Sequence, residues 1–377
     1  LAPTEILANQ HFKSLSELLI NYDVKVDLLT GSSKTRERNL IHSNLLSGKT
    51  NILVGTHAIL EDVVKFKNLG LSIIDEQHRF GVAQRAKLWK KNNPAPHILV
   101  MTATPIPRTL AMSLYGDLDI SYIKELPPGR ITTKTVHKYD RNRLSVFKFL
   151  KDQINKGRQV YLVYPLINES EKLDYKDLMD GYESIVREFP RPDFQVSIVH
   201  GKMKAKDKDY EMKRFINQET QILVSTTVIE VGVNVPNASV MVIESAERFG
   251  LSQLHQLRGR VGRGNDESYC VLMTKDKLSE DSKLRIETMV KVSDGFKLAE
   301  VDLKLRGPGD MLGTRQSGML RFKLADIVYD TEILNNARNS VIKLLKTDPR
   351  LNKNENLPIR DEIFNSSNSK NLWRYIS

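Results

Sequence analysis

The chain has 377 residues, 40% of them hydrophobic, and a formal net charge of +11. It is too long for one ordinary domain and has no apolar run that would span a membrane, so we expect two or three domains and no membrane partner. The single cysteine, Cys270, excludes an intramolecular disulfide framework, is typical of a buried small hydrophobe and fits a reducing cytoplasm. The basic excess favours nucleic acid as a partner, with general lysine enrichment for solubility as the alternative.

The chain does not begin with methionine, and residues 1–4 are typical of a strand end that enters a loop. From there short apolar runs alternate with helical spacers, which predicts βαβ units and parallel sheets. The breaker from Pro127 to Gly129 predicts a junction between two α/β domains. The predicted strands before it are Ile52–Gly55, Leu71–Ile74 and His97–Met101, and those after it are Val160–Tyr164, Val196–Val199, Gln221–Val224, Val240–Ile243 and Tyr269–Met273.

Two carboxylates follow the strand predicted at residues 71–74. That run is apolar, which predicts burial on both faces of a parallel sheet and places Asp75 and Glu76 at its carboxyl end, where open α/β sheets bind ligands. Asp75 is suited to holding Mg²⁺, and Glu76 to orienting and deprotonating an attacking water. His78 is a candidate to sense nucleotide or to bridge to the neighbouring domain. An acidic strand end that caps the next helix is the alternative.

A turn with two arginines among glycines lies at residues 256–264, after a polar helix face. Arginine carries a permanently charged fork that matches phosphate oxygens, and glycine lets the backbone approach a ligand closely. The pair Arg260 and Arg263 is therefore typical of an arginine finger, which delivers charge to a transferring phosphoryl group. A solvated basic turn is the alternative, and the acidic pair at residues 75–76 argues against it.

Hydroxyls and glycines follow several of the predicted strands. Such groups suit the phosphate oxygens of a nucleotide or of a DNA backbone, although each one alone is more typical of a helix N-cap. Together they predict a polar ligand-binding edge made by Thr56, His57, Thr102, Thr104, His200, Gly201 and Thr226.

After residue 275 short apolar runs no longer alternate with helical spacers. Residues 278–292 predict a helix, the glycine-rich stretch 302–318 predicts a loop in which Arg306 and Arg315 bridge two moving parts, and residues 322–377 predict further helices. Earlier in the chain, residues 47–50 imitate a phosphate-binding loop. They fail the motif because Ser43 stands where it needs glycine and because they lead from a helix into a strand, so we interpret them as a turn.

With these residues in place, the chain resembles the RecG family of ATP-dependent DNA helicases, within helicase superfamily two, over essentially its whole length. Residues 2–11 resemble motif Ia, and residues 75–81, 101–110, 225–236 and 256–263 match motifs II, III, V and VI. Residues 29–32 and 55–57 resemble its DNA-contact motifs. Residues 302–318 resemble the translocation motif, which transcription-repair coupling factors share. Gln77 and the stretch 306–309 favour RecG, whereas Asn234 stands where the family is expected to have aspartate.

The resemblance implies an α/β fold with two RecA-like parallel-sheet domains, the first incomplete, and a mostly helical C-terminal extension. We expect these at residues 1–124, 125–275 and 276–377. It also implies that a wedge domain and the phosphate-binding loop lie upstream of Leu1 in full-length relatives, so we expect a fragment with little or no ATPase activity alone. ATP and Mg²⁺ are the implied cofactors, with Asp75 as the Mg²⁺ ligand.

The implied site residues fall into three groups. The catalytic residues are Asp75, Glu76, Arg260 and Arg263. The nucleotide-binding residues are His78, Gly232, Asn234 and Gln256. The DNA-binding and translocation residues are Pro3, Thr4, Thr30, Gly31, Thr56, His57, Thr102, Thr104, His200, Gly201, Thr226, Arg306, Arg315 and Gln316.

These residues and the resemblance together predict the motor portion of an ATP-dependent translocase that remodels branched double-stranded DNA. Stalled replication forks and Holliday junctions, in recombination and repair, are the implied substrates. We expect a cytoplasmic monomer, and contacts with other replication or repair proteins stay open. An RNA helicase of the same superfamily and a non-catalytic nucleic-acid-binding adaptor are the alternatives.

Overall fold

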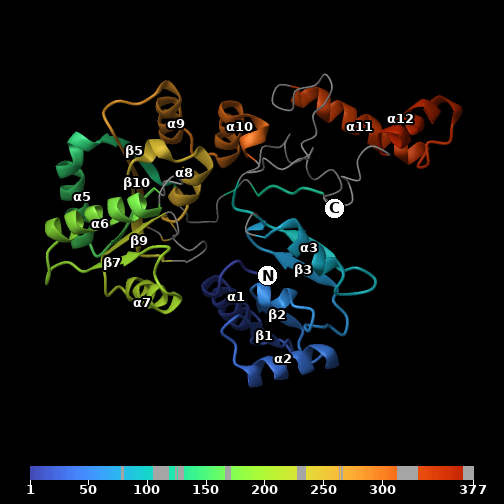
Figure 1. Ribbon diagram of the computed structural model, residues 1–377, viewed down its shortest axis with the longest axis horizontal. Helices are drawn as coiled ribbons and strands as arrows, with labels where there is room; N and C mark the ends of the chain where they lie inside the picture. The colour runs from blue at the N-terminus through green and yellow to red at the C-terminus, as the bar shows by residue number, and fades with distance from the viewer. Residues whose placement is uncertain are drawn as a thin grey trace. The chain divides into compact units, whose positions relative to one another are not determined.

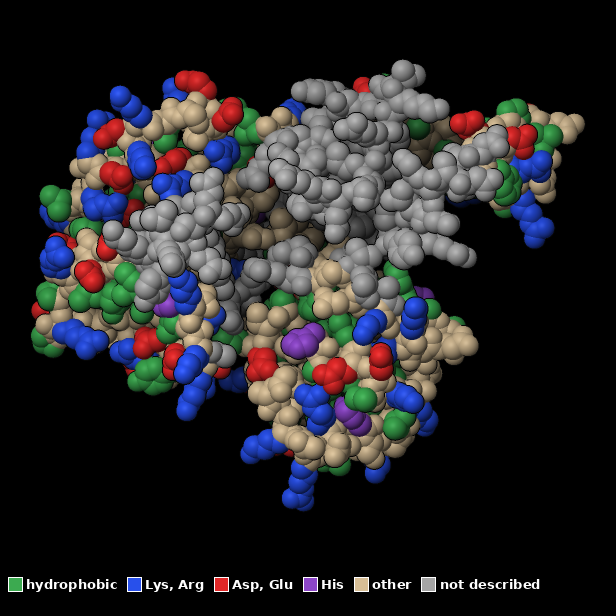
Figure 2. Space-filling model, in the orientation of Figure 1, with side chains coloured by type: hydrophobic (Ala, Val, Ile, Leu, Met, Phe, Trp, Pro, Cys, Tyr) green, Lys and Arg blue, Asp and Glu red, His purple; other side chains and the backbone are tan. Residues whose placement is uncertain are grey.

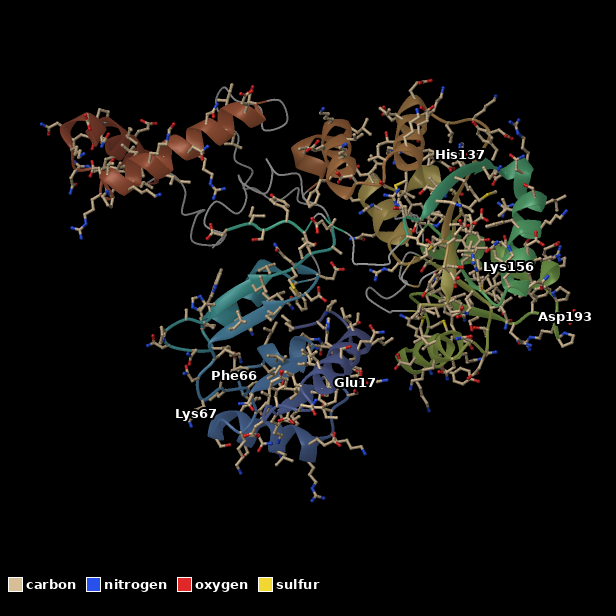
Figure 3. The ribbon with its side chains drawn as sticks, turned by 180° about the vertical axis from the view of Figure 1, so that it is seen from behind. Glu17, Phe66, Lys67, His137, Lys156 and Asp193 are labelled. Atoms are coloured by element: carbon tan, nitrogen blue, oxygen red, sulfur yellow. The ribbon has the colours of Figure 1, made fainter. Side chains whose placement is uncertain are left out.

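The computed structural model describes residues 1–77, 80–104, 119–123, 125, 131–165, 171–226, 235–262, 264, 266–311 and 330–367. The chain divides into two compact units, of which the first contains residues 1–104 and 125–295 and the second residues 105–124 and 296–377. Figure 1 shows their helices and strands, and Figure 3 shows them from behind.

The first unit begins with two short parallel sheets. They consist of β1 (Val26–Leu29) with β2 (Ile52–Gly55), and of β3 (Leu71–Ile74) with β4 (His97–Val100). Leu1 and Ala2 hydrogen-bond to both: the Asp75 N–H donates to the Leu1 carbonyl at 3.0 Å, and the Ala2 N–H to the Gly55 carbonyl at 2.8 Å. The carboxyl ends of β2 and β3 are therefore held on either side of the same short segment.

Helices α1 (Glu5–Leu18) and α2 (Thr35–Ser47) pack on the first of these sheets. Helix α1 begins after Thr4, whose hydroxyl accepts the Leu7 N–H at 3.3 Å as an N-cap. Helix α2 ends at Gly48, which adopts a left-handed conformation with φ 77° before the chain enters β2. Residues 47–50 are therefore a helix end that leads into a strand, as predicted. The 3-10 helix η1 (His57–Leu60) and helix α3 (Val82–Trp89) lie beside the second sheet.

A six-stranded parallel sheet with the order β5-β10-β9-β6-β8-β7 makes up the rest of the first unit. Its strands are β5 (Lys134–Tyr139), β6 (Gln159–Tyr164), β7 (Val196–Val199), β8 (Ile222–Thr226), β9 (Ala238–Ile243) and β10 (Tyr269–Thr274). The central strands β6, β8 and β9 are apolar and buried, as expected where helices cover both faces. Strand β5 is at one edge, and Figure 3 labels His137 on it.

Helices cover both faces of this sheet. On one face, α5 (Arg143–Asn155) and α6 (Glu171–Glu188) share a core with Val160 and Leu162 of β6. Because side chains alternate along a strand, Tyr161 points to the other face. There its ring meets that of Phe215 on α7 (Ala205–Ile216), with 5.0 Å between centroids. The remaining elements of the unit are η3 (Asp140–Asn142), η4 (Ala246–Arg248), α8 (Leu251–Arg258) and α9 (Glu280–Lys291).

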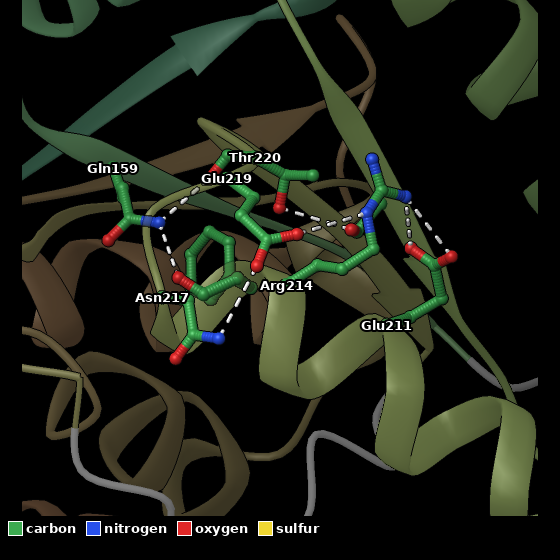
Figure 4. A network of polar contacts seen from close by, with 8 residues as sticks. Gln159, Glu211, Arg214, Asn217, Glu219 and Thr220 are labelled. Carbon is green, nitrogen blue, oxygen red and sulfur yellow. Dashed lines mark hydrogen bonds and ion pairs between the residues drawn. The ribbon is translucent and has the colours of Figure 1, made fainter.

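A polar network holds the end of α7 against the sheet (Figure 4). The buried side-chain amide of Gln159 donates to the carbonyls of Phe215 and Thr220, both at 2.7 Å. Arg214 pairs with Glu211 at 3.1 Å on the helix itself. Carbonyls near a helix C-terminus have no partner within the helix, so Gln159 of β6 satisfies one of them and fixes the connection from α7 to β8.

The C-terminal helices correct one prediction. They are α10 (Gly295–Met311), α11 (Thr331–Thr347), η5 (Asn354–Asn356) and α12 (Leu357–Ser367). The predicted loop at residues 302–318 is wrong as far as Met311, because α10 runs through it. Leu298, Ala299 and Leu303 are buried and recur at helical spacing, so burial of this face overrides the weak helix propensity of the glycines and proline that follow. Residues 312–318 lie outside the described part of the chain.

Strand β3 corrects a second prediction. Burial on both faces is wrong, since Leu71 and Ile73 are 53% and 42% exposed while Ile74 is fully buried. An apolar run does not by itself reveal which of its faces is covered. The other predicted strands agree closely with the observed ones, α9 confirms the helix predicted at 278–292, and Cys270 is buried as expected. Strands β1 and β5 were not predicted.

Positive charge is spread over the described surface. On the face shown in Figure 2, Lys and Arg side chains project from several regions, with Asp and Glu among them. The net charge therefore does not point to a single patch on that face. Among the helices of the described residues, none has the length and apolar character that a membrane span needs.

Candidate nucleotide and nucleic-acid site

Asp75 lies directly after β3, at the carboxyl end of the strand, as the sequence predicts. Its Oδ1 accepts the Glu76 N–H at 2.9 Å, and its Oδ2 lies 3.0 Å from Nε2 of His11 on α1. The hydrogen bond to His11 holds the pKa of Asp75 below its usual value, although partial burial acts in the opposite direction. Asp75 is therefore ionised at neutral pH, and its side chain is 23% exposed, which leaves it accessible to a cation.

Glu76 follows in an unusual backbone conformation. Its φ is +51°, in the left-handed region that residues other than glycine rarely adopt and that is enriched at functional positions. Its buried side chain places Oε2 3.4 Å from the N–H of Ala103, and the next residue, Gln77, donates its N–H to the Met101 carbonyl at 3.2 Å. The turn after β3 is thereby folded against the segment that follows β4.

A hydrogen bond joins the segment after β4 to helix α8. The Gln256 side-chain amide donates to Oγ1 of Thr104 at 2.8 Å, and the Thr104 N–H donates to Oγ1 of Thr102 at 3.1 Å. The sequence assigns Gln256 to nucleotide and the two threonines to DNA. In the structure Gln256 and Thr104 bind each other, so the residues after β4 are connected to the helix that precedes the arginine turn.

The arginine turn begins where α8 ends. Arg260 is half-buried, and its N–H donates to the Leu257 carbonyl at 3.0 Å. Gly262 has φ +75°, and a Cβ at this position would lie 2.7 Å from Oγ of Ser268. Only glycine suits this conformation and this spacing. Arg263 lies outside the described residues, so its role beside Arg260 stays a prediction.

Arg258 is a position that the sequence analysis did not single out. Its guanidinium, in a residue only 6% exposed, donates to the carbonyls of Met289, Val292 and Ser293 at 3.1, 2.9 and 3.0 Å. These carbonyls lie at the C-terminal end of α9, where the helix dipole favours a cation. Arg258 also lies 3.0 Å from Nδ1 of His255, and burial together with this positive charge lowers the pKa of His255 to about 4. The imidazole is therefore neutral and accepts the hydrogen bond.

Several hydroxyls of the predicted polar edge are buried. Thr56 and Thr226 are almost fully covered, as is Thr30 of the predicted DNA-contact turn. Their neighbours differ: His57 at the start of η1 and Thr102 after β4 are exposed. A DNA phosphate would therefore reach the exposed members first, and contact with the buried hydroxyls stays a prediction.

The turn at residues 30–32 is fixed by Glu5 of α1, which the sequence analysis did not assign. The Glu5 carboxylate accepts the Ser32 N–H and the Ser32 hydroxyl, both at 2.9 Å. A Cβ on Gly31 would lie 3.2 Å from Oε1 of Glu5, so the glycine allows this close approach. Thr30 donates its N–H to Oγ of Ser33 at 2.9 Å. The predicted DNA-contact turn is therefore held by the first residue of α1.

Some of the remaining predicted positions lie in the first unit, and the others lie outside the described residues. Pro3 and Thr4 precede α1, and His200 and Gly201 follow β7. Burial and then the charges of Lys208 and Lys202 lower the pKa of His200, so this imidazole is neutral at pH 7. His78, Gly232, Asn234, Arg263, Arg315 and Gln316 lie outside the described residues, and of Arg306 only the helical backbone is described.

The donor set at Asp75 fits Mg²⁺. This cation prefers oxygen ligands and commonly takes only one or two carboxylates, completing its shell with water and substrate phosphates. Asp75 offers ionised oxygens at a partly exposed strand end. Among the described residues, no group of three or more His, Cys, Asp or Glu side chains is placed to hold a metal by itself.

Comparison with known proteins gives the class. Residues 1–113 match the family model of DEAD/DEAH box helicases, and residues 145–265 match that of the helicase conserved C-terminal domain. Residues 292–377 match the model described as ATP-dependent DNA helicase RecG, domain 3, C-terminal. The parallel sheets and these matches place the chain among the helicase families with RecA-like domains.

The similar curated proteins narrow this class. ATP-dependent DNA helicase RecG of Synechocystis sp. is 50% identical over 360 residues, which cover 96% of this chain and 43% of that protein. RecG of Bacillus subtilis is 49% identical over 366 residues, which cover 97% of this chain and 53% of that protein. The chain belongs to the RecG family, and it spans about half the length of the curated relatives it matches.

Solved structures agree with this assignment. A structure of RecG bound to a three-way DNA junction matches 89% of this chain and 43% of that chain, with a TM-score of 0.72 and 42% identity. Dbp5 of S. cerevisiae, bound to RNA and ADP BeF3, matches with a TM-score of 0.54 at 14% identity. The second similarity reflects the fold alone.

Proposed function

We propose that this chain is the motor portion of an ATP-dependent translocase that remodels branched double-stranded DNA. Family membership supports the motor, and the similar RecG structure on a three-way junction supports the branched substrate. One observation carries the proposal: Glu76 accepts from Ala103, and the neighbouring Thr104 accepts from Gln256. The acidic pair is thereby connected through the segment after β4 to helix α8. We therefore expect a displacement of the acidic pair to be transmitted through these hydrogen bonds to the turn that carries the arginines.

In this proposal Asp75 holds Mg²⁺ and Glu76 orients the attacking water and accepts its proton. Magnesium, when bound, neutralises charge on the phosphate oxygens. The buried carboxylate of Glu76 faces the Ala103 N–H, which restricts where it accepts a proton. Arg260 and Arg263 deliver positive charge to the transferring phosphoryl group, and an arginine finger contributes roughly 10³–10⁵ in rate.

Coupling to DNA is the second part of the proposal. The exposed residues His57, Thr102 and Gly201 follow strands of the first unit and contact phosphates. The stretch from Arg306 to Gln316 transmits the movement to the duplex. We propose the boundaries 1–124, 125–275 and 276–377 for the three parts, and a monomer as the working state.

The experiment compares ATP hydrolysis by the 377-residue chain with hydrolysis by a fusion in which the N-terminal part of the B. subtilis relative precedes Leu1. The sequence contains no phosphate-binding loop, so the chain alone should show little DNA-stimulated turnover, whereas the fusion should be active. A three-way junction should stimulate the fusion more than linear duplex DNA or structured RNA of equal length.

Each alternative has its own signature in this assay. Equal or greater stimulation by RNA would favour an RNA helicase. Junction binding by the fusion with no hydrolysis would favour a non-catalytic adaptor. Turnover by the chain alone at the rate of the fusion would refute the need for a phosphate-binding loop outside these residues.

A further inference from the structure

His11 contacts the acidic pair from a distant part of the chain. It lies on α1, 64 residues before Asp75, and its Nε2 is 3.0 Å from Oδ2 of that carboxylate. The other oxygen, Oδ1, accepts the Glu76 N–H at 2.9 Å. Each carboxylate oxygen therefore has one hydrogen bond, and the two bonds come from different elements.

The packing of α1 determines where His11 lies. Leu7 and Ala8 are buried against the sheet β1–β2, and Phe12 and Leu15 pack beside them. Residues three and four apart share a helix face, so His11 lies at the border of this apolar face. Its side chain is 40% exposed, so it is accessible from solvent while it reaches Asp75. The contact is therefore built by helix packing and not by a flexible surface side chain.

The direction of the hydrogen bond follows from the charge of Asp75. An ionised carboxylate only accepts, and an aspartate side chain, whose ordinary pKa is about 3.9, is ionised at pH 7. The Nε2 atom of His11 must then carry the proton and donate it. Without this donor, rotation about the last torsion of Asp75 would be restrained only by the Glu76 N–H, since this torsion is intrinsically broad.

We infer that His11 is a positioning residue whose Nε2–H fixes the orientation of the Asp75 carboxylate for a divalent cation. The inference rests on the proposed role of Asp75 as the Mg²⁺ ligand. Hydrogen-bond partners of ligating groups orient them, and losing one typically weakens metal binding by 10–100-fold. A partly exposed contact of this kind adds little to folding stability. The effect should therefore be found in metal affinity and not in unfolding.

The test uses the 377-residue chain and Mn²⁺ alone, which shares the oxygen-ligand preference of Mg²⁺ and broadens nearby amide signals. The measured midpoint is the Mn²⁺ concentration at which the amide signals of Asp75 and Ala103 have lost half of their intensity in ¹H–¹⁵N spectra. The informative variants are His11→Gln, whose amide nitrogen reaches the place of Nε2, and His11→Asn, whose amide does not. Lys13→Ala is the matched control on α1, because Lys13 pairs with Glu17 instead.

We expect the midpoint to rise about tenfold in His11→Asn and His11→Ala and to stay within about twofold of wild type in His11→Gln and Lys13→Ala. Asp75→Asn should abolish the broadening. If wild type and His11→Asn had equal midpoints while Asp75→Asn showed no broadening, the inference would be overturned. Asp75 would then remain the proposed metal ligand. Failure of a folded His11→Gln to restore binding would also overturn it. No selective broadening in wild type would overturn the metal role of Asp75 and the inference with it.

Discussion

Replacing Arg258 by alanine should destabilise the first unit around α8 and α9. The guanidinium donates to the carbonyls of Met289, Val292 and Ser293, at the end of α9 where no intrahelical donor is available. A hydrogen bond to a charged group contributes about 1.5–3 kcal/mol, and a buried carbonyl left unsatisfied costs about 1–3 kcal/mol. Burial of the guanidinium opposes these terms, as its lowered pKa shows. The Met289 bond is buried, the bonds to Val292 and Ser293 are partly exposed, and no charge is left unpaired, so the expected net loss is about 2–3 kcal/mol.

The appropriate assay is local, because the chain contains more than one compact unit and its unfolding need not be two-state. Native-state hydrogen exchange at the amides of α9 reports the free energy of opening that helix. Arg248→Ala is the matched control, since Arg248 is an exposed arginine in η4 and its loss should change stability by no more than about 0.5 kcal/mol. Arg258→Lys should resemble alanine more than wild type, because one ammonium does not reproduce the planar fork of five donors.

A clear result would refute this reasoning. If Arg258→Ala changed the opening free energy of α9 by less than about 1 kcal/mol, the three carbonyls would have other partners or access to water. The arginine would then not be what joins α8 to the end of α9.

Three further predictions follow from the first unit. Gly55→Ala should destabilise it by about 3 kcal/mol in urea unfolding, because a Cβ would overlap the Leu29 carbonyl oxygen, whereas Gly70→Ala has open space and should be neutral. Burial holds the pKa of His255 at about 4, against 6.5 in the unfolded chain, so the folded state binds fewer protons than the unfolded state. The free energy of unfolding is therefore unaffected by this group above about pH 6.5 and falls by roughly 3 kcal/mol as the pH is lowered to 4. If a His255→Asn variant lost as much stability in acid as wild type, other titrating groups would be responsible for that loss. Glu76→Gln in the fusion should lower ATP hydrolysis by at least about 100-fold while nucleotide binding persists, and wild-type rates would exclude Glu76 as the base.

Much of the β-structure was predictable because apolar runs and their polar ends are local signals. The run before Asp75 and the helix end at Gly48 were both assigned correctly from a few neighbouring residues. Strand β5 was missed because an edge strand alternates between exposed and half-buried residues and carries little apolar signal. Helix α10 was missed because the glycines and proline after Arg306 were weighed, while the helical spacing of the buried residues before them was not.

The partners of the candidate site could not be predicted in the same way. Asp75 and Glu76 were identified from their place after a strand, but nothing near them in sequence indicates that His11 or Ala103 would bind them. Arg258 offered a weak signal, as a charged residue on a helix whose neighbouring Leu254 is buried. Contacts between residues far apart in sequence depend on how helices pack on the sheet, and this information is not local.

Helix α1 shows what those long-range contacts accomplish. Its first residue, Glu5, holds the N–H and hydroxyl of Ser32 in a predicted DNA-contact turn, and His11 on the same helix holds Asp75. The two residues are six positions apart, about 9 Å along a helix axis. A packed helix moves as a rigid element, so a shift of the Ser32 turn must either break the Glu5 contacts or move His11 against Asp75. The same helix therefore links a surface that is expected to meet DNA phosphates with the carboxylate that is expected to hold the metal.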